Sequence, residues 1–297
     1  MVAPRLDPLF PNFALRQVDV DGTSVNFVVG GSGTPVLMLH GYPQTHAMWH
    51  KVAPRLAQTH TVVCADLRGY GDSAKPDGGR DHVNYSKRAM AKDQVGVMRS
   101  LGLDRFAVVG HDRGGRVAHR MALDHPDRVT RLMLLDISPT RTMYAKTDQA
   151  FATAYYHWFF LIQPFDLPER LIGHDPVYYL RRKIGGWSSG LQHFDPASLA
   201  EYERCFSDPA TIHASCEDYR AAVSIDLQHD AEDADTCIRC PVRVLWGEKG
   251  VVNRLFDPIA DWSAVARSVS GRPLPCGHYL AEEAPAELIE ELEDFLV

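Results

Sequence analysis

The stretch Phe106-Ala-Val-Val-Gly-His-Asp-Arg-Gly-Gly-Arg116 decides the fold of this 297-residue chain. An apolar run leads into Gly110, and Gly114 follows two residues after Asp112. This spacing predicts a nucleophile elbow, a sharp strand-to-helix turn that presents one side chain in a strained conformation. Glycine is needed on both sides of Asp112 because the strand and helix backbones come close together there.

The residue at the centre of this elbow is aspartate rather than serine. A carboxylate nucleophile attacks carbon by displacement and leaves an alkyl ester on the enzyme, whereas serine would suggest acyl transfer. Asp112 is therefore the predicted nucleophile. The expected chemistry narrows to the opening of a carbon–halogen bond or an epoxide.

The composition is that of an ordinary soluble globular protein, 45% hydrophobic and 23% charged. The net charge of −7 and the lack of a basic tract argue against nucleic acid as a partner. No apolar run has the length of a membrane span, and the first residues lack the apolar core of a signal peptide. We therefore expect a cytoplasmic protein with no membrane partner.

Six cysteines are scattered along the chain, and Cys237 and Cys240 have the spacing of a redox or metal pair. No second pair completes a zinc site, and the segment precedes an apolar strand rather than starting a helix. We interpret these cysteines as reduced structural thiols. Neither a metal nor a cofactor is expected.

Strand and helix patterns alternate along the chain. A hairpin is expected around Asp21-Gly22. Further strands are expected at residues 35–39, 61–65, 106–110, 129–135 and 241–246, and helices at about 86–101, 117–123 and 285–295.

This alternation predicts an α/β fold with a mostly parallel central sheet and helices on both faces. From residue 139 to residue 230 the pattern changes to aromatic residues at helical spacing. We interpret this segment as a helical cap, or lid, inserted after the sixth predicted strand. Residues 1–138 and 231–297 would then form the core domain, with the ligand at the carboxyl ends of its strands.

Hydrolysis of an Asp112 ester needs a base, and His278 is the best candidate. It lies on a glycine-containing loop before the last helix, in the chain order nucleophile, acid, histidine. The acid that orients it has two candidates, Asp136 and Glu248, each following a predicted strand. We favour Asp136 because glycine stands at position 250, where an aspartate would usually fall.

Two backbone amides are predicted to form an oxyanion hole, those of Tyr42 and Arg113. Tyr42 belongs to the His40-Gly-Tyr-Pro43 loop after the third predicted strand. The oxyanion would form when water attacks the Asp112 ester.

Arg113 and Arg116 lie three residues apart and share one helical face beside the nucleophile. They would lower the pKa of Asp112 and clamp a carboxylate on the substrate through bidentate hydrogen bonds. The alternative is that one or both pair with acidic surface residues. A neutral substrate would gain nothing from this pair.

The cap contains His157-Trp158, whose ring N–H groups suit a leaving halide. Fluoride is strongly hydrated, so its departure needs several donors in a dry pocket. The alternative is that these aromatic residues pack in the core of the cap.

Together these residues resemble the α/β-hydrolase superfamily, in the branch of haloalkane dehalogenases and epoxide hydrolases, and are most similar to the fluoroacetate dehalogenases. The resemblance spans nearly the whole chain, and its specific elements are Asp112-Arg113 with Arg116 and His157-Trp158. Epoxide hydrolases usually have tryptophan where this chain has Arg113. One small departure is Tyr42, where the family often has phenylalanine.

The resemblance implies hydrolysis of fluoroacetate to glycolate and fluoride, with a small haloacid as the only partner besides a second copy in a homodimer. It implies that Arg113 and Arg116 hold the substrate carboxylate and that His157, Trp158 and Tyr219 hold the fluoride. One alternative is an epoxide hydrolase or a neutral haloalkane dehalogenase, for which Tyr155 or Tyr156 with Tyr219 could supply acids. Another is a non-catalytic ligand receptor on the same fold.

Overall fold

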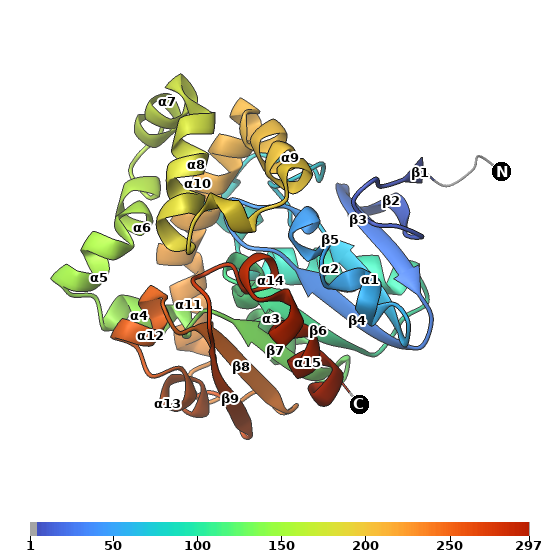
Figure 1. The fold of residues 1–297 in the computed structure, drawn as a ribbon. Helices are drawn as coiled ribbons and strands as arrows, with labels where there is room; N and C mark the ends of the chain where they lie inside the picture. The colour runs from blue at the N-terminus through green and yellow to red at the C-terminus, as the bar shows by residue number, and fades with distance from the viewer. Residues whose placement is uncertain (1–4, 297) are drawn as a thin grey trace.

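The computed structural model describes residues 5–296, and its centre is a nine-stranded sheet in the order β1-β2-β3-β5-β4-β6-β7-β8-β9 (Figure 1). The strands from β5 onward in this order pair in parallel, and the pairs β1–β2, β2–β3 and β3–β5 are antiparallel. The prediction of a mostly parallel central sheet is confirmed.

The strand positions follow the sequence pattern closely, and the hairpin turns at Asp21-Gly22 as predicted. The strands are β1 (Arg5–Leu6), β2 (Ala14–Val20), β3 (Thr23–Gly31), β4 (Thr34–Leu39), β5 (His60–Ala65), β6 (Phe106–His111), β7 (Val129–Leu135), β8 (Val242–Gly247) and β9 (Val269–Leu274). The sequence pattern did not locate β9. This edge strand is largely exposed and contains Gly271 and Pro273, so it lacks the apolar run that marked the others.

Helices cover both faces of the sheet. Figure 1 shows α1, α14 and α15 in front of it and α2 and α3 behind it. Their bounds are α1 (Ala53–Leu56), α2 (Lys87–Ser100), α3 (Arg113–Asp124), α14 (Leu280–Glu283) and α15 (Pro285–Phe295), with α12 (Val251–Leu255) and α13 (Pro258–Ser263) between β8 and β9, and the short turns η1 (His46–Trp49) and η2 (Arg80–Tyr85). The predicted α/β-hydrolase fold is confirmed.

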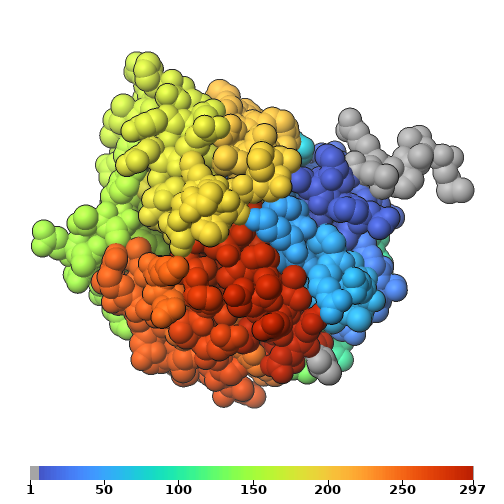
Figure 2. Space-filling view, in the orientation of Figure 1, coloured from blue at the N-terminus to red at the C-terminus, as the bar shows by residue number. Residues whose placement is uncertain are grey.

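The chain between β7 and β8 is helical, and it forms a body at one end of the sheet (Figure 1). Figure 2 shows this yellow-green body seated against the orange and red C-terminal segments and the blue N-terminal half. Its helices are α4 (Thr140–Ala145), α5 (Gln149–Ala154), α6 (Tyr156–Leu161), α7 (Leu167–His174), α8 (Pro176–Trp187), η3 (Leu191–His193), α9 (Pro196–Phe206), α10 (Pro209–Val223) and α11 (Ile225–Glu232). The preceding strand is the sixth one predicted, labelled β7 because the two-residue β1 comes first.

Three cap helices begin at the same sequence signal, an Asp-Pro pair. Asp175, Asp195 and Asp208 each accept a backbone N–H from the first turn of α8, α9 and α10, and proline follows at the first helical position. Such caps satisfy N–H groups that the helix itself leaves unpaired. The start of α10 thereby sets the position of the residues that this helix carries over the sheet.

The six cysteines are free thiols, and Cys237 is exposed. Within residues 5–296 no helix is long and apolar enough to cross a lipid bilayer.

Candidate active site

The predicted turn joins β6 to α3, and Asp112 lies in it with φ of 45° and ψ of −112°. This conformation is rare for a residue with a side chain, and the surrounding packing must maintain it. A Cβ atom on Gly110 would lie 2.6 Å from the carbonyl oxygen of Gly114, and one on Gly114 would lie 2.4 Å from that of His40. The two backbones therefore approach as closely as the glycine spacing predicts.

The Asp112 side chain is buried, and its Oδ1 accepts a hydrogen bond from the Tyr42 amide at 3.1 Å. Burial by itself raises the pKa of Asp112, but His278 and Arg116 outweigh it and the pKa is lowered. Arg113 also lowers it, to a smaller extent. The carboxylate is thus ionised, as a nucleophile requires.

His278 and Asp136 meet across 142 residues of sequence. Nδ1 of His278 lies 2.5 Å from Oδ2 of Asp136, and Oδ1 of Asp136 accepts the Gly247 amide at 2.9 Å. Burial opposes the charge on His278, but the hydrogen bond to Asp136 and the charges of Asp136 and Asp112 raise its pKa. Because Nδ1 is held in this way, Nε2 is the ring nitrogen left for proton transfer.

The alternative acid, Glu248, is exposed. A Cβ atom on Gly250 would lie 3.4 Å from Oδ1 of Asp136, so the position after β8 faces the carboxylate that already contacts His278. The structure brings Asp136, and not Glu248, to the histidine.

The two predicted arginines are both buried in the first turn of α3 but differ in their partners. Arg113 donates from Nε to Oδ2 of Asp218 at 2.8 Å and from Nη2 to Oδ1 at 2.7 Å. Arg116 donates from Nη1 to Oγ1 of Thr140 at 2.9 Å. Because Asp218 occupies the Nε–Nη2 edge of Arg113, that edge is not free for a substrate, and the predicted carboxylate clamp would have to use other nitrogens of the two arginines.

Each arginine nevertheless keeps one buried nitrogen for which residues 5–296 supply no hydrogen-bond partner. These atoms are Nη1 of Arg113 and Nε of Arg116. A buried N–H without a partner is costly, and a charge-assisted bond to an anion would satisfy it. Each arginine therefore has a donor nitrogen that a carboxylate would satisfy.

The three predicted halide ligands lie together in the cap. His157 and Trp158 are on α6 and Tyr219 is on α10, and all three are buried. The ring of Tyr219 has its centroid 5.5 Å from that of His157 and 6.5 Å from that of Trp158. Among the described residues, Nδ1 of His157, Nε1 of Trp158 and Oη of Tyr219 have no hydrogen-bond partner.

His157 is expected to be neutral, so that it can donate one ring N–H to a halide without carrying a positive charge. Burial and nearby positive groups, first among them Lys183, lower the pKa of His157 well below its usual value. The ring is therefore neutral and carries one N–H. Apolar packing accounts for burial of these rings but leaves their polar atoms unsatisfied, so packing alone does not explain the cluster.

The two arginines contact the predicted halide ligands His157, Trp158 and Tyr219, which we call the halide cluster, through two of its rings. Cζ of Arg113 lies 4.2 Å from the centroid of the Tyr219 ring, and Cζ of Arg116 lies 4.8 Å from that of Trp158. Both contacts are cation–π interactions, which desolvation strengthens. The cationic side chains of α3 and the aromatic residues of α6 and α10 are thus direct neighbours.

The sequence analysis missed Asp218, which directly precedes Tyr219. Besides Arg113, its carboxylate accepts hydrogen bonds from Oη of Tyr70 at 2.7 Å and from Nζ of Lys87. Burial raises the pKa of Asp218, but the charges of Arg113 and Lys87 outweigh burial and lower it. The sequence did offer a signal for Asp218. A buried arginine such as Arg113 needs an acidic partner, and Asp218 is a carboxylate next to Tyr219, a predicted site residue.

Comparisons with known proteins agree with this geometry. The family model of the alpha/beta hydrolase fold matches residues 34–285. A fluoroacetate dehalogenase from Burkholderia sp. is 48% identical over 97% of this chain and 95% of that protein, and a soluble epoxide hydrolase from Corynebacterium sp. (strain C12) is 36% identical over 93% and 94%.

The fold also matches a solved structure of a protein from Nostoc sp. PCC 7120, described as an alpha/beta hydrolase. The TM-score is 0.96, with 60% sequence identity over 96% of this chain and 98% of that one. The predicted family resemblance is confirmed. The chain belongs to the α/β-hydrolase fold family, in the branch that includes fluoroacetate dehalogenases and soluble epoxide hydrolases.

Proposed function

We propose that this protein hydrolyses the carbon–fluorine bond of fluoroacetate, giving glycolate and fluoride. The observation that carries the proposal is the contact of Arg113 with Tyr219 and of Arg116 with Trp158. In fluoroacetate the carboxylate and the fluorine are on neighbouring carbons, so groups that bind them must lie side by side. The likeness to a fluoroacetate dehalogenase supports the same substrate.

In the first step a carboxylate oxygen of Asp112 attacks the CH₂ carbon. The carbon–fluorine bond breaks, and its electron pair leaves with fluoride. Nη1 of Arg113 and Nε of Arg116 hold the substrate carboxylate, while N–H and O–H groups of the halide cluster stabilise the leaving fluoride. The enzyme then carries a glycolyl ester on Asp112.

In the second step water attacks the ester carbonyl carbon of Asp112, and Nε2 of His278 accepts the proton of the water. The amides of Tyr42 and Arg113 stabilise the oxyanion. When it collapses, glycolate leaves with the proton returned by His278. The second proton of the water remains on the regenerated Asp112 carboxyl and is released to solvent, which restores the carboxylate. Ester formation removes the Asp112 charge, one of the charges that raise the pKa of His278, so the pKa of the histidine falls at the step that needs a base.

Epoxide hydrolysis is the second candidate, because a soluble epoxide hydrolase is among the relatives. It would use Tyr219 with Tyr155, which is buried, rather than Tyr156, which is 50% exposed. An uncharged epoxide makes no use of two buried guanidiniums, so this candidate ranks second.

A fluoride-electrode assay tests the proposal. Fluoride release from fluoroacetate is expected, with little turnover of a simple epoxide or a bromoalkane. In His278→Asn the first step needs no base, so mass spectrometry should find a glycolyl adduct on the peptide that holds Asp112, and Asp112→Ala should form none. Epoxide turnover without fluoride release would make the second candidate the better one.

We also keep three expectations as proposals: a homodimer, a cytoplasmic location, and a division into core and cap at residues 139 and 231. Light scattering of the purified protein tests the first of these.

A further inference from the structure

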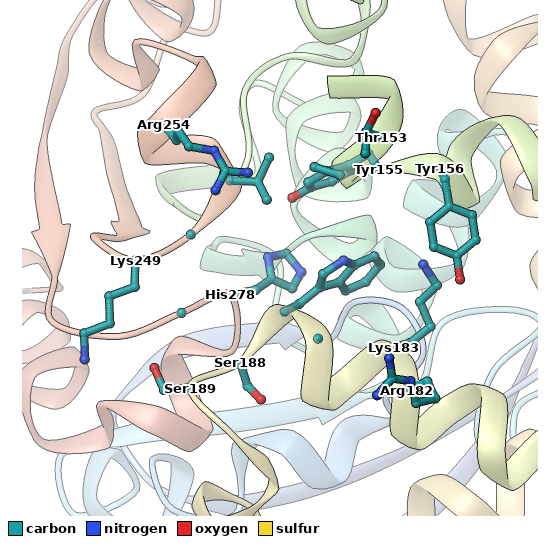
Figure 3. Close-up of a pocket in the computed structure, with 16 residues that line it drawn as sticks. Thr153, Tyr155, Tyr156, Arg182, Lys183, Ser188, Ser189, Lys249, Arg254 and His278 are labelled. Carbon is teal, nitrogen blue, oxygen red and sulfur yellow. The ribbon is translucent and has the colours of Figure 1, made fainter. Parts of the chain in front are cut away.

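A pocket of about 440 Å³ opens at the junction of cap and core, outside the halide cluster. Its walls come from α5, α6, α8 and α12 and from the loops that follow β8 and β9. Figure 3 shows Lys183 and Tyr156 on one side of His278, and Lys249 and Arg254 on the other. The pocket therefore reaches from solvent to the proposed catalytic histidine.

The charge of this pocket is opposite to that of the protein. Arg182, Lys183, Lys249 and Arg254 line it, and the lining residues that the structure describes include no Asp or Glu. Within residues 5–296 none of these four cations lies within 4.0 Å of a carboxylate oxygen, whereas the whole chain has a net charge of −7. A cleft lined by one sign of charge concentrates ions of the other sign.

Carboxylates do lie behind the wall. Asp136 is hydrogen-bonded to His278, and Asp112 acts on the same ring through its charge. Glu283 accepts backbone N–H groups from Ser189, Gly277 and Tyr279, at 2.8, 2.9 and 3.0 Å. Both of its oxygens are used in this way, so its charge is bound to the wall rather than directed into the pocket.

Lys183 is the unusual member of the set because it is only 3% exposed. Its Nζ lies 3.6 Å from the centroid of the Tyr156 ring and 4.7 Å from that of Trp187, with no hydrogen-bond acceptor among the described residues. Burial lowers the pKa of Lys183 to about 7. The rings stabilise the cation only in part, and its N–H groups would be satisfied by an anion.

Trp187 separates this lysine from the proposed reaction centre. Its ring centroid lies 4.4 Å from that of His157 and 5.4 Å from that of His278. The carbonyl oxygen of Trp187 accepts a hydrogen bond from the His278 amide at 2.9 Å, which connects the end of α8 to the loop that carries His278. An anion held at Lys183 is thus one indole ring away from the halide cluster.

We propose that this pocket is a staging site for small anions, in which Lys183 holds the anion and Trp187 separates it from the reaction centre. The identity of that anion as a haloacid rests on the proposed function. The positive pocket would then raise the rate of substrate capture and leave the chemical steps unchanged.

Fluorescence quenching of Trp187 tests the site without requiring turnover. The probes are iodide, an anion, and acrylamide, which is neutral, at about pH 6, where a lysine with the lowered pKa stays charged. The Trp187 signal is the difference between the parent and Trp187→Phe. In Lys183→Met its iodide quenching should fall roughly threefold while acrylamide quenching stays the same.

Two further variants make the result decisive. Lys249→Gln with Arg254→Gln changes only exposed side chains and should lower iodide quenching even if Lys183→Met fails to fold. Lys92→Met removes an exposed cation that pairs with Asp21 outside this pocket, and should change nothing. Equal iodide quenching in the parent, Lys183→Met and the double variant would overturn the staging site.

Kinetics then connect the site to the proposed reaction. The double variant Lys249→Gln with Arg254→Gln should lower kcat/KM for fluoroacetate roughly tenfold with kcat nearly unchanged, and added salt should weaken the parent more than the variant. If the parent releases no fluoride, the proposed function fails while the quenching result still decides the anion site. A kcat loss equal to the kcat/KM loss would contradict a capture role.

Discussion

Arg113 donates two hydrogen bonds to the carboxylate of Asp218, from its Nε to Oδ2 at 2.8 Å and from its Nη2 to Oδ1 at 2.7 Å. A third bond joins Nη2 to the Asp218 carbonyl oxygen at 2.8 Å. These bonds fix the orientation of the planar guanidinium, and only Nη1 remains for a ligand. Asp218 therefore compensates the buried positive charge of Arg113 and also decides which nitrogen of that arginine is left to donate to a substrate.

Asp218→Asn should weaken substrate binding, because the amide cannot accept both charge-assisted bonds from Arg113. Truncating one partner of a buried charge pair costs on the order of 2–4 kcal/mol, so kcat/KM for fluoroacetate should fall roughly 30- to 700-fold. The neutral analogue fluoroacetamide should lose much less. Steady-state assays on both substrates measure the ratio.

Tyr70→Phe is the matched control, because it removes a hydrogen bond to the same carboxylate and keeps the Arg113 pair. Its loss on fluoroacetate should be the smaller one. If Asp218→Asn slows fluoroacetate and fluoroacetamide equally, Asp218 is a structural residue only.

Trp158→Phe should distinguish halide binding from packing. The substitution keeps most of the ring volume but removes the Nε1–H group. Fluoride needs more hydrogen-bond help than chloride, so the rate on fluoroacetate should fall about tenfold more than the rate on chloroacetate.

Trp49→Phe is the control for this experiment, since Trp49 is also fully buried and its Nε1 also lacks a partner among the described residues. It lies in η1 rather than in the halide cluster. Trp49→Phe should affect both substrates alike, and the same result for Trp158→Phe would assign Trp158 to the core.

Asp136→Asn should separate the two chemical steps. The amide cannot stabilise the positive charge that His278 acquires, whereas displacement by Asp112 does not use His278 as a base. Ester hydrolysis should slow by about 10³-fold or more, and rapid-quench mass spectrometry should detect the accumulated ester.

Glu248→Gln tests the acid that the sequence left open. Glu248 is exposed, so this variant should retain the parental rate of ester hydrolysis. A loss comparable with that of Asp136→Asn would reverse the assignment.

The stability of the fold should depend on the charge of His46. This buried ring lies 2.9 Å from Oδ1 of Asp66 through Nδ1 and 3.1 Å from Oδ2 of Asp7 through Nε2. Burial lowers its pKa, but the two carboxylates outweigh burial and raise the pKa of His46 to about 10. A raised folded-state pKa stabilises the fold fully below the unfolded value of about 6.5, and the contribution disappears as pH rises through 10.

His46→Gln should therefore cost roughly 3–5 kcal/mol of unfolding free energy in mildly acidic solution and progressively less toward the folded-state pKa. Urea titrations across this range measure the difference from the parent. The same substitution at His174, which is exposed on α7, is the control. A difference that grows with pH would contradict the charged pair.

The elbow and the sheet could be predicted because their signals are local. The glycines around Asp112 lie within five residues of chain, and an apolar run of strand length reports burial on both faces by itself. β9 was not predicted because its local signal is weak. It is an exposed edge strand that contains Gly271 and Pro273 and has no apolar run.

The sequence by itself therefore determined the elbow that presents the proposed nucleophile, the parallel sheet and the types of side chain available for the site. The tertiary structure alone decided which of them meet. Asp136 pairs with His278 across 142 residues, and Asp218 pairs with Arg113 across 105. The first contact depends on how the chain segments on either side of the cap pack side by side in the sheet, and the second on how the cap docks on that sheet. No spacing within one element encodes either outcome, and the docking of the cap left Arg113 with only Nη1 for a substrate.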